Sequence, residues 1–130
     1  MNDRELLELA AKAAGKPDLV FNEGRTNAYY AGSLIYMTGK TSHQPWNPLN
    51  DDGDALRLAV KLRLDIEHGS ELDNDRYVYV SRNGIELVRD AVGCWEDIEE
   101  ETHRADATRH AITRAAAEIE RARITTEDGK

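Results

Sequence analysis

Three residues near the C-terminal end have the types and the spacing that a metal site could use. His103, Asp106 and His110 follow one another at i, i+3 and i+7, so a helix would place them on one face. The two histidines would then lie about 10 Å apart along the helix axis, which is too far to share one first-row metal ion. We therefore expect polar surface residues here and no metal site.

Two further groups of residues have side chains suited to nucleophilic catalysis or to calcium binding. Cys94 is the single cysteine, but no histidine can be placed beside it from the sequence, and free cysteines are most often small buried apolar residues. The aspartates at 51, 52 and 54 offer carboxylates, but Ala59 stands where the EF-hand pattern requires its last ligand, so helix capping explains them better. We expect no catalytic residues, no cofactor and no enzyme.

An acidic run precedes the last predicted helix. It consists of Glu96, Asp97, Glu99, Glu100 and Glu101. Like charges at this density repel one another and contribute nothing to a core. We therefore treat this acidic run as the hypothetical interaction site for a basic partner, because complementary charge speeds association. The alternative is a loop that only keeps the protein in solution.

Trp46 and His43 lie in residues 38–50, the longest stretch without a regular period. A tryptophan seldom stays exposed without a partner, so the simplest interpretation packs Trp46 on a sheet at the entrance of the next helix. The alternative places Trp46 and His43 in a pocket or recognition surface formed by a functional loop.

Arginines recur in the last predicted helix, at positions 104, 109, 114, 121 and 123. A basic helix can bind nucleic acid, but Asp106, Glu118 and Glu120 interrupt this surface, so solvated charge is the expected role. Acidic segments can instead imitate DNA phosphates, although a net charge of −8 over 130 residues is moderate for that role. We expect a protein partner and no direct binding of nucleic acid.

Composition indicates one folded acidic domain. The chain has 130 residues, of which 40% are hydrophobic and 32% charged. No apolar run approaches the ~18–20 residues of a membrane span, and the charged start of the chain lacks the apolar region of a secretory signal. We therefore expect a cytoplasmic protein that makes no contact with a membrane.

Hydrophobic periodicity predicts three helices and about five strands. Helices are expected over residues 3–14, 51–64 and 104–123, the second with an apolar stripe through Leu56, Ala59 and Val60. Strands are expected over residues 19–21, 29–37, 65–68, 76–81 and 85–88; residues 89–92 fit a strand or a helical turn. Asn83-Gly84 favours a type I′ hairpin, and four successive apolar residues at 34–37 indicate a strand covered on both faces.

This order of elements predicts an α+β fold. We expect an antiparallel sheet of about five strands covered by helices, an α-β-α sandwich. A single domain should occupy residues 1–124, and residues 125–130 should form a frayed tail.

Three blocks of the sequence carry a family resemblance. They read ELLELAAKAAG at 5–15, WNPL with DDGDALRLAVKL at 46–62, and ATRHAITRAAAEI at 107–119. In these blocks the chain resembles small phage and prophage proteins that are grouped as a phage ABA-sandwich domain of unknown function. That family usually has Arg-Arg where this chain has Arg109-His110. The resemblance implies a phage or prophage origin and a helix–sheet–helix sandwich, and it implies no reaction.

Size, acidity and resemblance together favour a non-enzymatic phage accessory protein. It would bind a host or phage macromolecule, as an inhibitor of host defence would, and it could act as a homodimer. The alternative is a protein that binds a small ligand or nucleotide, as a sponge, in a pocket near residues 38–50. A hydrolase that uses Cys94 or a histidine is a third alternative.

Overall fold

The computed structural model of the chain describes residues 2–16, 18–23, 31–36, 45–69, 77–91 and 100–128. Its elements follow in the order α1 (Asp3–Ala13), β1 (Leu19–Phe21), β2 (Leu34–Tyr36), α2 (Asp52–Leu62), β3 (Asp65–His68), β4 (Tyr77–Arg82), β5 (Ile85–Ala91) and α3 (Glu100–Asp128). The predicted α+β class is confirmed, because three helices pack on five antiparallel strands.

The five strands form two sheets, so the prediction of one sheet was wrong. β1 pairs with β2, and β3, β4 and β5 form a separate three-stranded sheet. Trp46 explains part of this division, because its backbone exchanges two hydrogen bonds with Leu34 of β2, at 2.8 and 3.0 Å. The segment around Trp46 thereby occupies the edge of β2 that a third strand would need, and the chain then turns into α2.

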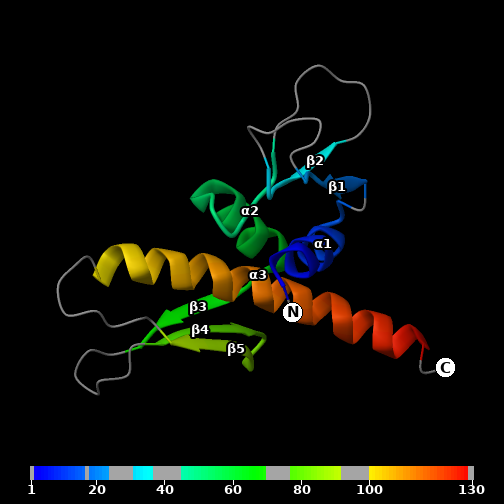
Figure 1. Cartoon of the computed structure of the whole chain (residues 1–130). Helices are drawn as coiled ribbons and strands as arrows, with labels where there is room; N and C mark the ends of the chain where they lie inside the picture. The colour runs from blue at the N-terminus through cyan, green and yellow to red at the C-terminus, as the bar shows by residue number, and fades with distance from the viewer. Residues whose placement is uncertain are drawn as a thin grey trace.

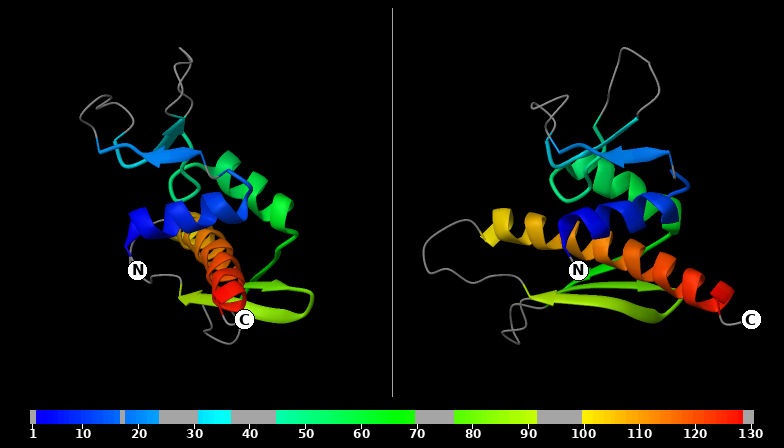
Figure 2. Two further views of the ribbon diagram at one scale, coloured as in Figure 1. Left: turned by 90° about the vertical axis from the view of Figure 1, so that its right-hand side faces the viewer. Right: turned by 45° about the vertical axis from the view of Figure 1, so that its right-hand side comes forward.

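The layers also differ from a sheet covered by helices on both sides. In Figures 1 and 2 the two sheets lie on opposite sides of the helices, with β1 and β2 beside α1 and α2, and β3–β5 beneath α3. The helices therefore share the interior, and each sheet covers one side of them. The covering predicted for residues 34 and 35 is confirmed, because Leu34 and Ile35 are both buried.

The first two helices begin where their caps predict. The side chain of Asn2 accepts a hydrogen bond from the Glu5 N–H, and that of Asp51 accepts one from the Asp54 N–H. The predicted apolar stripe of α2 was wrong in part, since Leu56 and Val60 are 63% and 67% exposed. The buried face of α2 instead comprises Asp54, Ala55, Leu58, Ala59 and Leu62.

The predicted hairpin joins β4 to β5. Asn83 and Gly84 adopt φ angles of 53° and 81°, which are the positive values that a type I′ turn requires. Val78 and Val80 point into the core, whereas Tyr77 and Tyr79 lie on the other face, where the Arg89 guanidinium stacks on both rings. Residues 89–91 continue β5, which decides the alternative between strand and helical turn for them in favour of the strand.

Helix α3 runs from Glu100 to Asp128 and extends beyond both predicted ends. Ile112 and Ala116 belong to the core formed with α1 and α2, whereas Ala111 and Ala115 belong to the core under β4 and β5. Residues 111–113 and 115–117 are all buried, so α3 is enclosed on most of its circumference over two turns. The small alanine side chains let neighbours approach it from both sides.

This enclosure predicts the effect of a larger side chain on α3. We expect Ala115→Leu to lower the free energy of unfolding by about 1–3 kcal/mol, because no space remains between α3 and β4. The control is Ala122→Leu, the same change at an exposed position of the same helix, which should stay within about 0.5 kcal/mol of the parent. Chemical denaturation measures both, and equal effects would contradict the double enclosure.

Candidate functional site

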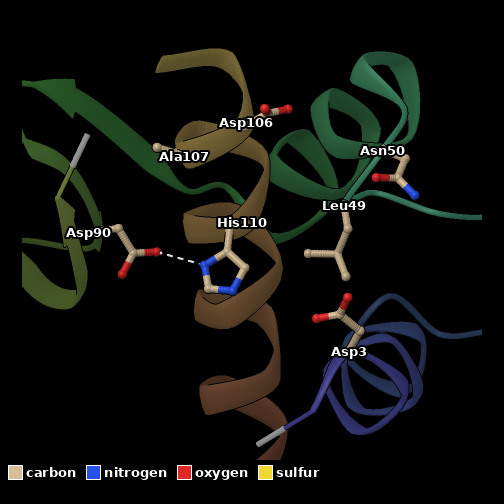
Figure 3. Close-up of a pocket in the computed structure, with 7 residues that line it drawn as sticks. All are labelled: Asp3, Leu49, Asn50, Asp90, Asp106, Ala107 and His110. Atoms are coloured by element: carbon tan, nitrogen blue, oxygen red, sulfur yellow. Dashed lines mark hydrogen bonds and ion pairs between the residues drawn. The ribbon is translucent and has the colours of Figure 1, made fainter. Parts of the chain in front are cut away.

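A hollow of about 600 Å³ lies between α1, α3, β5 and the segment that precedes α2. Its lining is formed by Asp3, Leu49, Asn50, Asp90, Asp106, Ala107 and His110. Figure 3 shows His110 in the middle of this group, with Asp90 on one side and Leu49 and Asp3 on the other. We call it the acidic hollow, because three of its lining residues are carboxylates and none is lysine or arginine.

His110 is held by Asp90, which lies across from it on β5. His110 Nδ1 lies 3.0 Å from Asp90 Oδ2, and a carboxylate can only accept, so Nδ1 carries the proton. In the neutral imidazole, Nε2 is then left as a hydrogen-bond acceptor. Arg114 binds the other oxygen of Asp90, whose side chain is only 13% exposed. The guanidinium of Arg114 thereby compensates the negative charge of the mostly buried Asp90 carboxylate.

Arg109 fixes the opposite wall of the acidic hollow. Its Nε donates to the backbone oxygen of Leu49 at 3.0 Å, and its guanidinium also binds Asp52 and Asp106. The side chain is only 15% exposed, so the prediction of solvated charge for the helix arginines was wrong at this position. Arg109 ties α3 to the start of α2 and thereby positions Leu49 and Asn50 at the hollow.

The chemistry available in the acidic hollow is that of hydrogen-bond acceptance. Asp3 presents an exposed carboxylate, Asn50 an amide oxygen and His110 its Nε2, while the exposed carboxylate of Asp106 is shared with Arg109. Within the residues that the structure describes, no group of three or more histidine, cysteine or acidic side chains is arranged to hold a metal ion. The arrangement suits the ammonium or guanidinium group of a basic partner, whose N–H groups all donate.

Only part of the predicted interaction site lies in the described part of the chain. Glu96, Asp97 and Glu99 fall outside the described residues, as does His43. Glu100 and Glu101 form the start of α3, and the backbone alone is described there. At about 1.5 Å per residue, Glu101 lies roughly 7–8 Å along the helix axis from Asp106, so the described end of the acidic run lies within two helical turns of the acidic hollow.

Trp46 is packed as the simpler interpretation predicted. It is 7% exposed and belongs to the core with Leu34 and Leu58. It also lines a second hollow, of about 510 Å³, that lies away from His110 and is bordered by α1 and α2. The two interpretations of Trp46 are therefore compatible, since a core residue here reaches a cavity wall.

A buried polar node explains the residues that follow Trp46. The Asp54 carboxylate accepts hydrogen bonds from the Asn47 backbone N–H at 2.9 Å and from Arg57 at 2.7 Å. The Asn47 side chain accepts from the Leu49 N–H and donates to the Gly32 carbonyl and the Ser33 hydroxyl. Asp51 therefore caps α2 as predicted, whereas Asp54, in the first turn of α2, closes the loop that begins at Asn47.

Sequence reasoning missed the pairing of Asp90 with His110, and with it the acidic hollow. His103, Asp106 and His110 were considered only as neighbours on one helix. A usable signal was the alternation in β5, because Asp90 shares a face with the buried Val88 and so places a carboxylate toward the interior. The sequence alone does not identify His110 as the partner of Asp90, because the two residues are 20 positions apart in the chain.

A second histidine, His68 at the end of β3, also meets α3. Its Nδ1 lies 3.1 Å from the Arg104 guanidinium, which can only donate, so Nδ1 accepts. Burial and, second, the positive charge of Arg104 lower the pKa of His68 below its ordinary value of 6.5.

The hydrogen bond between His110 and Asp90 predicts a defined tautomer. We expect long-range ¹H–¹⁵N spectra of the neutral side chain to show His110 protonated at Nδ1. Asp90→Leu removes the acceptor, so the proton should move to Nε2, the tautomer that an unpartnered histidine favours. Arg114→Gln is the matched control, because it removes the other partner of Asp90 and leaves the acceptor in place. A Nδ1–H tautomer in Asp90→Leu would contradict the assignment.

The lowered pKa of His68 predicts a pH dependence of stability. Between the folded pKa and about 6.5 the unfolded chain binds more protons, so stability decreases as the pH falls through that window. We expect His68→Gln to lose this contribution, so that its unfolding free energy falls less than the parent's between pH 7.5 and 5.5. Arg104→Gln should retain part of it, because burial is the larger cause. Equal slopes for parent and His68→Gln would refute the prediction.

Comparisons with known proteins add no relative from which a role could be transferred. No family model, curated protein or solved structure matches the chain. In the described part of the chain, none of the helices has the length and apolarity that crossing a membrane would require. The geometry and charges of the two hollows are therefore the basis for assigning a function.

Proposed function

We propose that the chain is a non-enzymatic accessory protein of phage or prophage origin that binds a basic segment of a partner protein in its acidic hollow. The observation that supports this most directly is the set of acceptors around the hollow, Asp3, Asn50 and His110 Nε2, with no lysine or arginine among the described lining residues. Asp106 adds an exposed carboxylate that it shares with Arg109. A lysine or arginine of a partner supplies the donors that these groups need.

The position of the acidic run supports the same proposal. Its last two members, Glu100 and Glu101, begin α3, and the helix continues from there into the wall of the hollow. The run attracts a basic partner at long range, and the hollow then holds one of its cationic side chains. Electrostatic attraction of this kind raises the association rate and weakens in salt.

The biological role within this proposal is inhibition of a host or phage macromolecule in the host cytoplasm, as a defence inhibitor would act. It is supported by the resemblance to phage accessory proteins and by the net charge of −8, which disfavours nucleic acid as the partner. Binding alone suffices for such inhibition, so the role requires no reaction.

Peptide binding tests the acidic hollow. The probe is a labelled peptide that alternates arginine and glycine, with a glutamate–glycine peptide as the charge control. We expect the parent to bind the arginine peptide and Asp3→Asn/Asp106→Asn to bind it about tenfold more weakly, since two charge-assisted contacts are lost. Melting temperatures verify that the variant is folded.

The matched control is Asp18→Asn/Asp65→Asn, which removes two exposed carboxylates outside the hollow and gives the same net charge. It should bind the arginine peptide nearly as the parent does. A third variant, Glu99→Gln/Glu100→Gln/Glu101→Gln, should slow association and flatten its salt dependence. Equal weakening by the two aspartate pairs would attribute binding to net charge alone and would overturn the proposed site.

A further inference from the structure

The second hollow, which we call the Trp46 hollow, differs from the acidic hollow in charge. Three cationic side chains line it, Lys16 after the end of α1 and Arg57 and Lys61 on α2, against the single carboxylate of Asp54. This is a local surplus of positive charge in a chain whose net charge is −8. Such a surplus on an acidic protein favours an anionic ligand.

The carboxylate in the Trp46 hollow does not oppose an anion strongly, because its charge is already compensated. Asp54 Oδ2 accepts from the Asn47 N–H at 2.9 Å, and Oδ1 accepts from Arg57 at 2.7 Å. The ammonium groups of Lys16 and Lys61 form no ion pair or hydrogen bond with other side chains in the described part of the chain. Both are therefore available to a ligand.

The remaining wall of the Trp46 hollow is apolar, and the indole N–H of its tryptophan has no hydrogen-bond partner among the described residues. Pro45, Trp46 and Leu58 line it, and Trp46 is 7% exposed. The Trp46 indole N–H can only donate, and it donates to none of the described residues. Nearly all buried polar groups in folded proteins have a hydrogen-bond partner, so this donor calls for an acceptor beyond the described residues, which a bound ligand can supply.

We propose that the Trp46 hollow binds a small phosphorylated molecule with a flat apolar ring, the chemistry of a mononucleotide. Lys16 and Lys61 contact the phosphate, since ammonium groups are common phosphate ligands of proteins. Arg57 lies beside them but is paired with Asp54 at 2.7 Å and with Asp51 at 3.9 Å. The ring packs on Pro45, Trp46 and Leu58. A volume of about 510 Å³ falls within the range of pockets that enclose ligands of this size.

The site is independent of the acidic hollow in its chemistry, although the two share one segment of chain. Residues 45–54 contribute Pro45, Trp46 and Asp54 to one hollow and Leu49 and Asn50 to the other. Failure of the arginine-peptide test therefore leaves this proposal unaffected, and the reverse also holds.

Titration with three probes separates the parts of the ligand. The probes are adenosine monophosphate, adenosine and inorganic phosphate, added to the parent protein at physiological salt. Binding is followed by calorimetry and by the indole ¹H–¹⁵N resonance of Trp46, which Trp46→Phe assigns. We expect the monophosphate to shift this resonance and to bind at least tenfold more tightly than either adenosine or phosphate.

Single lysine substitutions then test the site. Lys16→Gln and Lys61→Gln should each weaken monophosphate binding by about fivefold to tenfold, because each removes one phosphate contact. Lys12→Gln is the matched control, since Lys12 is an exposed lysine of α1 outside this hollow, and it should leave binding unchanged.

Four outcomes would overturn the proposal. The first is an unshifted Trp46 resonance at saturating monophosphate. The second is equal affinity of the three lysine variants for the monophosphate. In that case Lys16 and Lys61 would only offset the negative partial charge at the C-terminal ends of α1 and α2. The third is inorganic phosphate that binds as tightly as adenosine monophosphate, which would exclude a role for the ring. The fourth is adenosine that binds as tightly as adenosine monophosphate, which would exclude recognition of the phosphate.

Discussion

The enclosure of α3 between two cores is the constraint on which the rest of the structure depends. Ala111 and Ala115 face the three-stranded sheet, while Ile112 and Ala116 face α1 and α2. A helix covered on both sides needs small side chains, because each added methylene pushes a neighbouring layer away. α3 also provides one wall of the acidic hollow, through Asp106, Ala107 and His110. The Trp46 hollow lies instead between the residues that follow α1, the segment around Trp46 and α2.

Local signals in the sequence predicted most of the elements, because their causes are local. Asn2 and Asp51 act as caps, and Asn83-Gly84 forms the hairpin turn. The errors concern partners that are distant in the chain. The apolar residues Leu56 and Val60 suggested the wrong face of α2, because periodicity does not show that a carboxylate, Asp54, is buried in their place. The division into two sheets depends on the backbone of Trp46, whose pairing has no sequence signature.

The candidate sites were less predictable than the fold, for the same reason. Trp46 was identified as either a packing or a pocket residue, and the structure places it in both settings. The acidic hollow was missed, since it requires α1, β5 and α3 to meet, and no residue in it is unusual within its own segment. Asp90 and His110 become informative only as a pair, when one is shown to orient the other. Hydrogen bonds of this kind depend on tertiary packing, whereas caps and turns depend on a few successive residues.

The segment of residues 45–54 is shared by the two proposed binding sites. It is held by the Asn47–Asp54 node and by Arg109, and it contributes walls to both hollows. If both ligands bind as proposed, a shift of this segment caused by one ligand changes the wall that the other contacts. Coupling of that kind is reciprocal in free energy, so a partner that strengthens small-molecule binding is itself bound more tightly when the small molecule is present.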